Sequence, residues 1–354
     1  MSVLELIILI LNIIFCIPSL ASITKFDNWW IRVFDFPRIQ IAILICVNML
    51  LAVCVYSFQE PWHFIIVAAL GLCLVYQCWL IYPYTYLAKN QVINYDGKDS
   101  SHNISILVSN VLMTNTKYQL LIDLIKSKDP DLFLTLETNK EWENALQVLE
   151  SDYTYSVKVP LENLYGMHLY SKLPLEDIQV DYLVKDDIPS IQGYVRLKND
   201  QKARIHCLHP RPPSPTESKT STNSDAELLL VGDQIEENPK LTLVFGDLND
   251  VAWSRTTKIF QKISGLMDPR RGRGFFNTFS ADYKLFRWPL DHVFHTDDFT
   301  LVEISREKHI GSDHFPMYIK LNYAPEKEGE QEKLDVNEDE KEWAKSKIED
   351  GLHN

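Results

Sequence analysis

Three apolar stretches near the start of the chain restrict its fold more than any other feature. They run roughly over Val3–Ile23, Ile39–Phe58 and Phe64–Tyr82. Each is close to the ~20 residues that a helix needs to cross about 30 Å of hydrocarbon, where a helix satisfies its own backbone. Tryptophan and tyrosine residues flank the stretches, as they do at membrane interfaces. The sequence therefore predicts a membrane anchor of three transmembrane helices over residues 1–87.

Two other interpretations of these stretches compete with this one. A cleaved signal peptide would need a positively charged start and a shorter apolar run than the first stretch has. Core helices of a soluble protein would explain one such stretch more readily than three in succession.

The orientation of the anchor is predicted from the basic residues beside it. Lys25, Arg32 and Arg38 lie between the first two stretches, whereas the second connection, near Glu60, has no lysine or arginine. The positive-inside rule then predicts a cytoplasmic first loop. After three crossings, the rest of the chain would face the cytoplasm as well.

The remainder of the chain has the composition of a soluble protein with an uneven charge. The formal net charge is −13, and the segment from Ala324 onward holds eleven acids against five lysines. A protein that binds duplex DNA tightly through its phosphates would usually be more basic, although a nuclease that captures phosphate through a metal is not excluded. Cys207 is the one cysteine outside the apolar stretches, so neither a disulfide framework nor a zinc site is predicted.

The residues after the apolar stretches divide into three parts. Residues 88–102 are polar and predict a linker. Residues 324–354 are charged and predict a disordered tail, with one short amphipathic helix marked by Trp343 and Ile348 as the alternative. Between them, the catalytic domain is expected over residues 103–323. Helices are expected at Tyr118–Lys128, Trp142–Leu149, Ala226–Glu237 and Thr256–Ile263. Strands are expected at Ile104–Ser109, Leu132–Leu136, Tyr153–Val159, Met167–Tyr170, Gly193–Leu197, Arg204–Leu208, Leu241–Phe245 and Met317–Leu321.

This mixture has more strands than helices and no regular strand–helix–strand repetition. It favours an α+β domain in which helices cover two packed sheets. Polar side chains stand at the ends of several apolar runs, where they can gather at one edge of a sheet. In Gly246-Asp247-Leu248-Asn249 the Asp and Asn are two residues apart, so they point the same way on a strand. The alternative is an Asx turn in which Asn249 caps the following helix.

Two further polar segments at the ends of apolar runs carry acidic groups. Ser312-Asp313-His314 precedes the last strand, and adjacent Asp and His side chains can divide metal ligation and proton transfer between them. A surface turn is the alternative interpretation. Glu137 ends the run Leu132–Leu136 and offers the carboxylate oxygen that Mg²⁺ prefers. Taken alone, it would be read as a solvated strand end.

The order of these motifs resembles that of the endonuclease/exonuclease/phosphatase superfamily, which has the DNase I-like fold. The shared positions extend over about residues 102–322, and in chain order they are Asn110, Glu137, His209, Gly-Asp-Leu-Asn at 246–249, Leu-Asp-His at 290–292 and Ser-Asp-His-Phe-Pro at 312–316. The resemblance implies a four-layer α/β/β/α sandwich, preceded here by three transmembrane helices as in membrane-anchored bacterial members.

The resemblance also implies a metal site. Glu137 would be the principal ligand of Mg²⁺, with Mn²⁺ as an alternative ion. Asn110 would lie beside it, and Asp313 would complete the metal side. A hard cation at this place neutralises the charge that develops on a phosphate during hydrolysis.

The remaining shared residues would perform the chemistry. The resemblance implies that Asp247 orients or deprotonates the attacking water and that Asn249 holds a phosphate oxygen. His314 would face the phosphate, with its imidazole held in position by Asp291. His209 would be a second histidine, as in the nuclease branch of the family.

Two departures from the family pattern bear on the number of metal ions and on the branch of the family. Leu112 stands where some nucleases carry an Asp, which argues against a second metal ligand there. The Trp-Pro-Leu-Asp-His sequence that begins at Trp288 departs from the pattern of the inositol-phosphate branch. Arg271 and Arg273 lie in a glycine-rich segment and are candidate phosphate ligands, since guanidinium groups bind phosphate bidentately. A solvated basic turn is the alternative, and His168 is expected to be structural.

The resulting hypothesis is a membrane-anchored phosphoesterase that hydrolyses a phosphodiester or phosphomonoester by metal-assisted attack of water. The tether favours a lipid or polyprenyl phosphate, so the expected partners are the lipid bilayer and this substrate, and no protein partner can be inferred. The alternatives are an endonuclease or exonuclease acting on DNA or RNA and a non-catalytic membrane scaffold. The expected location is the bacterial plasma membrane. Some membrane-anchored bacterial relatives carry this domain outside the cytoplasm, so both sides stay open.

Overall fold

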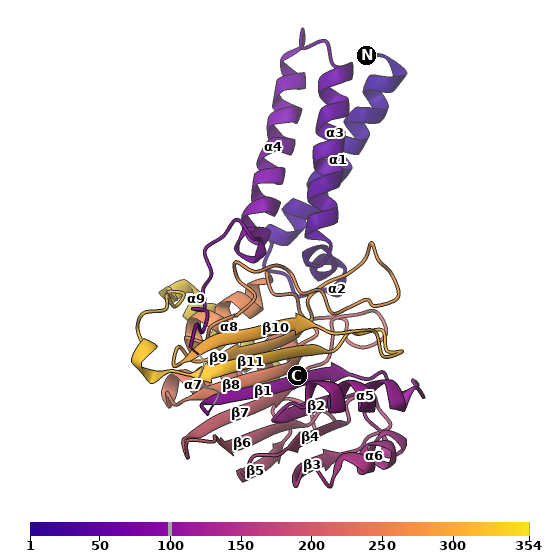
Figure 1. Cartoon of the computed structure of the whole chain (residues 1–354). Helices are drawn as coiled ribbons and strands as arrows, with labels where there is room; N and C mark the ends of the chain where they lie inside the picture. Colours follow the sequence, from indigo (N-terminus) through magenta and orange to yellow (C-terminus); the bar gives the residue numbers. More distant parts are fainter. Residues whose placement is uncertain (98–100, 354) are drawn as a thin grey trace.

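The computed structural model describes residues 1–97 and 101–353, so residues 98–100 of the predicted linker lie outside the described part. A bundle of three long helices stands on the body of the protein (Figure 1). The helices are α1 (Val3–Ile23), α3 (Arg38–Val55) and α4 (Pro61–Ile81). Each of them is long and apolar enough to cross a membrane, which confirms the three predicted apolar helices.

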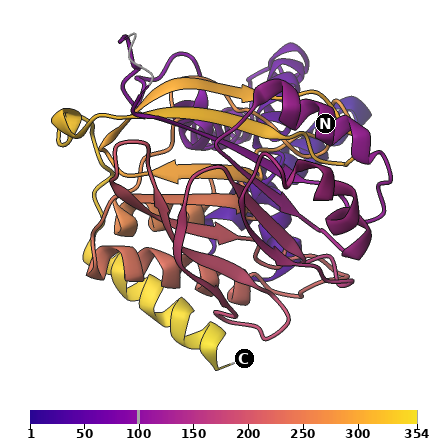
Figure 2. The same cartoon turned by 60° about the horizontal axis from the view of Figure 1, so that its bottom comes forward.

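The body contains two mixed β-sheets that pack against each other (Figures 1 and 2). The six-stranded sheet has the order β10-β11-β1-β2-β4-β3, with bounds Phe299–Arg306, Met317–Tyr323, Asn103–Asn110, Leu132–Leu136, Met167–Ser171 and Tyr155–Val159. The five-stranded sheet has the order β5-β6-β7-β8-β9, with bounds Leu175–Asp181, Ser190–Arg196, Lys202–Leu208, Thr242–Asp247 and Asp291–His295.

One parallel pair of strands in each sheet determines where the polar strand ends meet. Strands β1 and β2 are parallel, with Asn110 opposite Leu136. Strands β7 and β8 are also parallel, with Leu208 opposite Gly246. The carboxyl ends of parallel neighbours lie at one edge of a sheet, so the residues that follow these four strands are gathered there.

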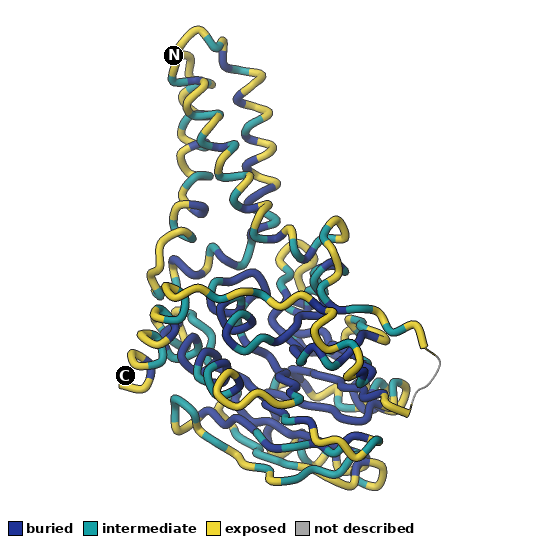
Figure 3. Tube along the Cα trace, turned by 90° about the vertical axis from the view of Figure 1, so that its left-hand side faces the viewer, coloured by how far each residue is buried: buried dark blue, intermediate teal, exposed yellow. Residues whose placement is uncertain are grey.

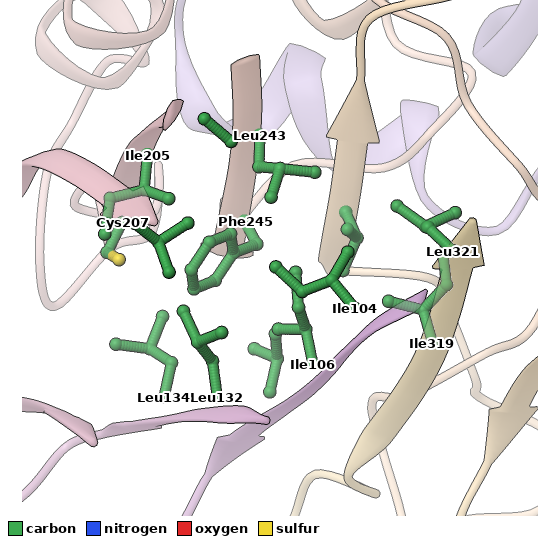
Figure 4. Packing of buried hydrophobic residues seen from close by; sticks show 14 of the residues in the cluster. Ile104, Ile106, Leu132, Leu134, Ile205, Cys207, Leu243, Phe245, Ile319 and Leu321 are labelled. Carbon is green, nitrogen blue, oxygen red and sulfur yellow. The ribbon is translucent and has the colours of Figure 1, made fainter. Parts of the chain in front are cut away.

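The facing sides of the two sheets form the main hydrophobic core (Figure 4). Ile106 of β1, Leu134 of β2 and Phe245 of β8 are all fully buried in it. Burying a side chain of this size contributes about 1.5–3 kcal/mol relative to leaving it in water. The inter-sheet core therefore holds the two parallel strand pairs together, and buried residues run through the centre of the body (Figure 3).

Helices cover the outer face of each sheet and complete the four layers. Helices α5 (Tyr118–Lys128) and α6 (Lys140–Leu146) pack on the six-stranded sheet, and α7 (Thr222–Glu237) and α8 (Arg255–Ser264) pack on the five-stranded sheet. Strand β1 is buried at every position because it has apolar neighbours on both faces. This α+β, DNase I-like arrangement confirms the predicted fold class.

The segment predicted to be a disordered tail contains a helix instead. Helix α9 (Glu338–Leu352) begins at a capping box in which Asn337 accepts from the Glu340 amide and Glu340 accepts from the Asn337 amide. Trp343 and Ile348 pack with Ile259 of α8 and other apolar residues of α7 and α8. Figure 2 shows α9 lying along the body. The apolar face of the helix packs on the body, and Glu340 and Lys347 pair with Lys262 and Asp27 beside it, an arrangement that composition alone does not reveal.

The described part of the predicted linker also packs against the body. Val92 is fully buried in the core between the sheets. The Ile93 amide donates to Gln331 Oε1 at 2.8 Å, and the Tyr95 amide donates to the Leu301 carbonyl at 2.8 Å. These backbone contacts fix the path of residues 92–95, so this stretch is not a loose tether.

Two connections fasten the helix bundle to the body. Between α1 and α3, the short helices α2 (Trp29–Arg32) and η1 (Val33–Asp35) lie on the body, and the Trp253 indole donates to the Asp35 carbonyl at 2.7 Å. After α4, the Tyr84 hydroxyl donates to the Ala252 carbonyl at 2.6 Å. The loop between α1 and α3 therefore lies at the end of the bundle that faces the body.

Gly246 has very little space at the end of β8, and replacing it tests the fold there. A Cβ added at Gly246 would lie 2.0 Å from the carbonyl oxygen of Leu208, and its φ is +152°. We expect Gly246→Ala to lower the free energy of unfolding by about 3 kcal/mol, because neither backbone can move without breaking the strand pair. Urea unfolding of the purified full chain measures this change.

The matched control for Gly246 is Gly71→Ala in α4, where an added Cβ meets nothing within 4 Å. This variant should unfold like the wild type. Equal stability of Gly246→Ala and wild type would contradict the strand packing described here.

Candidate active site

The Asn110 side chain lies at the centre of the gathered polar residues. Its amide nitrogen donates to Glu137 Oε1 at 2.8 Å and to Asp247 Oδ2 at 3.1 Å. Glu137 follows β2 in one sheet, whereas Asp247 ends β8 in the other. The amide oxygen of Asn110 accepts from the Leu112 backbone at 3.1 Å, which fixes the orientation of the amide. One buried side chain therefore joins both sheets at the site.

Asp247, Asp291 and His314 form a connected group beside Asn110. His314 Nδ1 lies 2.9 Å from Asp291 Oδ2, and His314 Nε2 lies 3.5 Å from Asp247 Oδ2. All three side chains are buried. The Ser312 hydroxyl places this group relative to β1, because it donates to the Asn110 carbonyl at 2.8 Å and accepts from the His314 amide at 3.0 Å.

The charges of this group support one another. Burial alone would disfavour an imidazolium, but the carboxylates of Asp247 and Asp291 raise the pKa of His314 to about 10. Burial acts to raise the pKa of Asp247, yet His314 and His209 together hold it below its ordinary value. At neutral pH, Asp247 is therefore an ionised carboxylate beside a protonated His314. This pair offers a proton acceptor and a positive charge within the same small space.

Glu137 occupies a different electrostatic position. Burial and the nearby carboxylates of Asp313 and Asp247 raise the pKa of Glu137 to about 7, although the Asn110 amide and His314 act in the opposite direction. Its backbone adopts a left-handed conformation with φ of 58°, which residues other than glycine rarely do and which is common at functional positions. Negative charge is thus concentrated at Glu137 and its neighbours, where a cation would stabilise it.

His209 and Asn249 border the same group. His209 is buried, with Nε2 4.0 Å from Asp247 Oδ2, and its ring lies 5.3 Å from that of Tyr165. The backbone amide of Asn249 donates to Asp247 Oδ1 at 2.9 Å, so an Asx turn is present. Asn249 does not cap α8, however, because the Ser254 side chain accepts from the Thr257 amide in that role. The Asn249 side-chain nitrogen instead donates to the Pro210 carbonyl at 2.9 Å.

Among the described residues, no hydrogen bond or ion pair joins Arg271 or Arg273 to this group. The Arg273 guanidinium donates to the Pro269 carbonyl at 3.0 Å and to the Asn94 side chain at 2.6 Å, so it holds the segment after the helix bundle. The guanidinium carbon of Arg271 lies 5.7 Å from the ring centre of Tyr84, at the end of that bundle. His168 is buried in the six-stranded sheet, where the sequence interpretation expected a structural residue.

Arg32 and Asp250 belong to a buried ion cluster that sequence reasoning missed. Arg32, from the loop between the first two apolar helices, lies 3.6 Å from Asp250 Oδ2, 3.5 Å from Asp225 Oδ1 and 3.5 Å from Asp35 Oδ2. Asp250 directly follows Asn249 in the chain. The helix bundle thus touches the loop that carries Asp247. Asp250 could have been noticed beside Gly-Asp-Leu-Asn, but no pattern pairs it with Arg32.

Comparison with known proteins places these observations in a wider context. Residues 107–314 match the model of the Endonuclease/Exonuclease/phosphatase family. No curated protein matches the sequence. Among solved structures, the chain is similar to humanized TDP2 of D. rerio with 14 mutations, at 16% identity and a TM-score of 0.53, covering 63% of this chain and 100% of that one.

Two further structures show the same likeness. The human Nocturnin catalytic domain with bound sulfate matches at 15% identity and a TM-score of 0.51, covering 63% of this chain and 94% of that chain. An endonuclease/exonuclease/phosphatase from Beutenbergia cavernae matches at 15% identity and a TM-score of 0.50, covering 63% and 72%. At these low sequence identities, the similarity shows a shared fold only.

Replacing Arg32 tests the ion cluster. We expect Arg32→Met to lower the free energy of unfolding by about 3 kcal/mol, because it leaves several buried carboxylates without their cation. Lys25→Met is the matched control, since Lys25 is an exposed cation of the same loop, and it should change stability by less than about 0.5 kcal/mol. Denaturant unfolding of the full chain in detergent measures both, and equal effects of the two variants would refute the cluster's role.

Proposed function

Because this chain belongs to the Endonuclease/Exonuclease/phosphatase family, whose members are metal-dependent hydrolases of phosphate esters, we propose that it is a membrane-anchored phosphoesterase. It hydrolyses a phosphodiester or phosphomonoester by in-line attack of water. The observation that carries this proposal is the contact of Asn110 with both Glu137 and Asp247, which joins a cation-binding side and a water-activating side in one buried site.

The donor set fits a hard divalent cation. Glu137 and Asp313 supply carboxylates, and burial together with the charge of Asp313 raises the pKa of Glu137 to about 7, while Asn110 supplies an amide beside them. Oxygen donors of this kind suit Mg²⁺, with Mn²⁺ as an alternative. When bound, the ion would polarise the phosphate ester and neutralise its developing charge.

A second arrangement of possible ligands is less suited to the ion. Carboxylate oxygens of Asp247 and Asp291 and a ring nitrogen of His314 lie within 4.8 Å of one another. However, His314 Nδ1 is engaged by Asp291 at 2.9 Å, and Nε2 faces Asp247 at 3.5 Å. An imidazolium carries a proton on each ring nitrogen, so it has no lone pair for a metal. We therefore assign this group to proton transfer and phosphate binding.

The residues then divide the reaction as follows. Ionised Asp247 orients the attacking water and accepts its proton. Protonated His314, held by Asp291, donates to a phosphate oxygen and stabilises the negative charge that grows on it. His209 and Asn249 border the same space and would contact the other phosphate oxygens. Because Arg271 and Arg273 lie beside the helix bundle, they take no part in this step.

The position of the site favours a substrate at the membrane surface. Asp250, three residues after Asp247, pairs with Arg32, which lies in the loop between the apolar helices α1 and α3. Ala252, two residues further on, accepts a hydrogen bond from Tyr84, which directly follows the apolar helix α4. If these helices span a bilayer, the site lies close to its headgroups. We therefore favour a lipid or polyprenyl phosphate in a bacterial plasma membrane. DNA or RNA remains the second candidate, since the solved TDP2 structures include one of the D. rerio protein with a single-strand DNA product.

A substrate panel tests the proposal. The full chain in detergent is incubated with Mg²⁺ and, separately, with a phospholipid, a polyprenyl diphosphate, plasmid DNA, RNA and a generic phosphodiester. We expect hydrolysis of a lipid substrate, its loss on addition of EDTA and its return on addition of excess Mg²⁺. Cleavage of nucleic acid alone would overturn the lipid assignment, and no cleavage of any substrate would favour a non-catalytic scaffold.

The two central residues allow a direct test of mechanism. Asp247→Asn and His314→Gln should each reduce kcat by at least about 100-fold, because the proton acceptor or the positive charge is lost. The domain should stay folded, which circular dichroism checks. Asp187→Asn is the control, since Asp187 is an exposed carboxylate that pairs with Arg211 at 2.8 Å, and it should keep the wild-type rate. Wild-type kcat in either site variant would remove that residue from the mechanism.

A further inference from the structure

A cavity lies where the helix bundle meets the body, and residues of α8 and α9 are among those that line it. Figure 1 shows the arrangement of these helices. Its volume is about 350 Å³. Its walls come from the last residues of α1 and α4, the loop between α1 and α3 with the first residue of α3, the start of α8, and α9. None of the proposed catalytic or metal-binding residues lines it, so it is separate from the candidate active site.

Two basic side chains of α8 line this cavity without acidic partners. Arg255 and Lys258 are half-buried, and neither forms an ion pair with any described residue. One terminal nitrogen of Arg255, Nη1, is fully buried and has no hydrogen-bond partner. Burial lowers the pKa of both groups; the nearby cations Arg32 and Lys262 act in the same direction on Arg255 and Lys258 respectively, and Glu340 acts against both effects. Unpaired, partly desolvated cations of this kind are costly unless an anion joins them.

The acids in the cavity wall do not supply that anion. Asp35 is paired with Arg38, Asp27 is paired with Lys347, and Glu340 is paired with Lys262 at 2.7 Å. Asp339, the remaining acid, is exposed to solvent. The buried part of the cavity therefore keeps an excess of positive charge at Arg255 and Lys258.

Aromatic residues place the cavity at the level of lipid headgroups. Trp79 lies near the end of α4 and is largely exposed, as expected for a tryptophan at a membrane interface. Lys258 Nζ lies 4.7 Å from the ring centre of Trp79, so the cation and the interfacial ring face each other. Arg255 lies 6.0 Å from the ring centre of Trp343 on α9. The same cavity thus borders both the apolar helices and the basic start of α8.

We propose that this cavity binds the phosphate of an anionic membrane lipid, with Arg255 and Lys258 as its ligands. A guanidinium and an ammonium group together suit a phosphate diester, and the aromatic rim suits the glycerol region beside it. The site holds a lipid without reacting with it, and it depends on α1, α3 and α4 lying in a bilayer rather than on the proposed catalysis. The bound lipid would sit against the same junction that carries Arg32.

The test measures lipid binding to the full chain by native mass spectrometry in detergent, with EDTA present so that no lipid is hydrolysed. The probes are phosphatidylglycerol, phosphatidylcholine and inorganic phosphate. We expect phosphatidylglycerol to bind more tightly than phosphatidylcholine. In the double variant Arg255→Gln/Lys258→Gln, its dissociation constant should rise about tenfold or more. The charge-preserving variant Arg255→Lys/Lys258→Arg should keep most of the binding.

The control variant Lys126→Gln/Lys240→Gln removes two exposed lysines that do not line the cavity, and it should bind phosphatidylglycerol like the wild type. An equal loss in this control would show that only the overall charge matters, which overturns the proposal. Unchanged binding in the Arg255/Lys258 variant would do the same. Displacement of the lipid by an equal concentration of inorganic phosphate would show that the site takes free phosphate instead.

Discussion

The amide of Asn110 is the interaction on which the site depends, because it is shared by two carboxylates from different sheets. Glu137 and Asp247 would otherwise repel each other across the gap between the sheets. The amide can take this position only because the inter-sheet core brings the ends of β1, β2 and β8 to the same place. Ser312 then ties the Asn110 carbonyl to the backbone of His314, so the final motif of the domain is aligned by the same residue.

Much of the fold could be predicted from the sequence because its central strands are buried on both faces. Such strands are continuous apolar runs, and β1, β2 and β8 stand out for that reason. Strands β5, β9 and β10 were not predicted. Strand β5 is an edge strand with exposed, charged positions, and β10 is buried in only its first half. Their strand conformation depends on pairing with β6, β8 and β11 respectively, and the local residue pattern does not contain these pairings.

The site was predictable to a similar degree and for a related reason. Residues at the ends of buried strands were identified, and the structure brings Asn110, Glu137, Asp247, Asp291 and His314 together. The two candidate arginines instead contact residues beside the helix bundle, because a guanidinium can serve any nearby carbonyl, as Arg273 does. In the sequence, Arg32 served only to predict which side of the membrane the first loop faces. Its pairing with Asp250 crosses more than half of the chain, and nothing in the sequence links the two positions.

The double attachment of the body to the helix bundle has a mechanical consequence. A domain joined by one flexible segment can swing and turn, so it samples a hemisphere around its anchor point. Here Arg32 forms an ion pair with Asp250 of the body, and Tyr84 donates a hydrogen bond to Ala252 at a second place. The backbone of residues 92–95 is hydrogen-bonded to the body as well. Rotation about a single hinge is therefore blocked, and the site keeps a constant height and facing. If the apolar helices span a bilayer as proposed, the site stays at one distance from its surface, and a membrane-borne target would reach it by lateral diffusion.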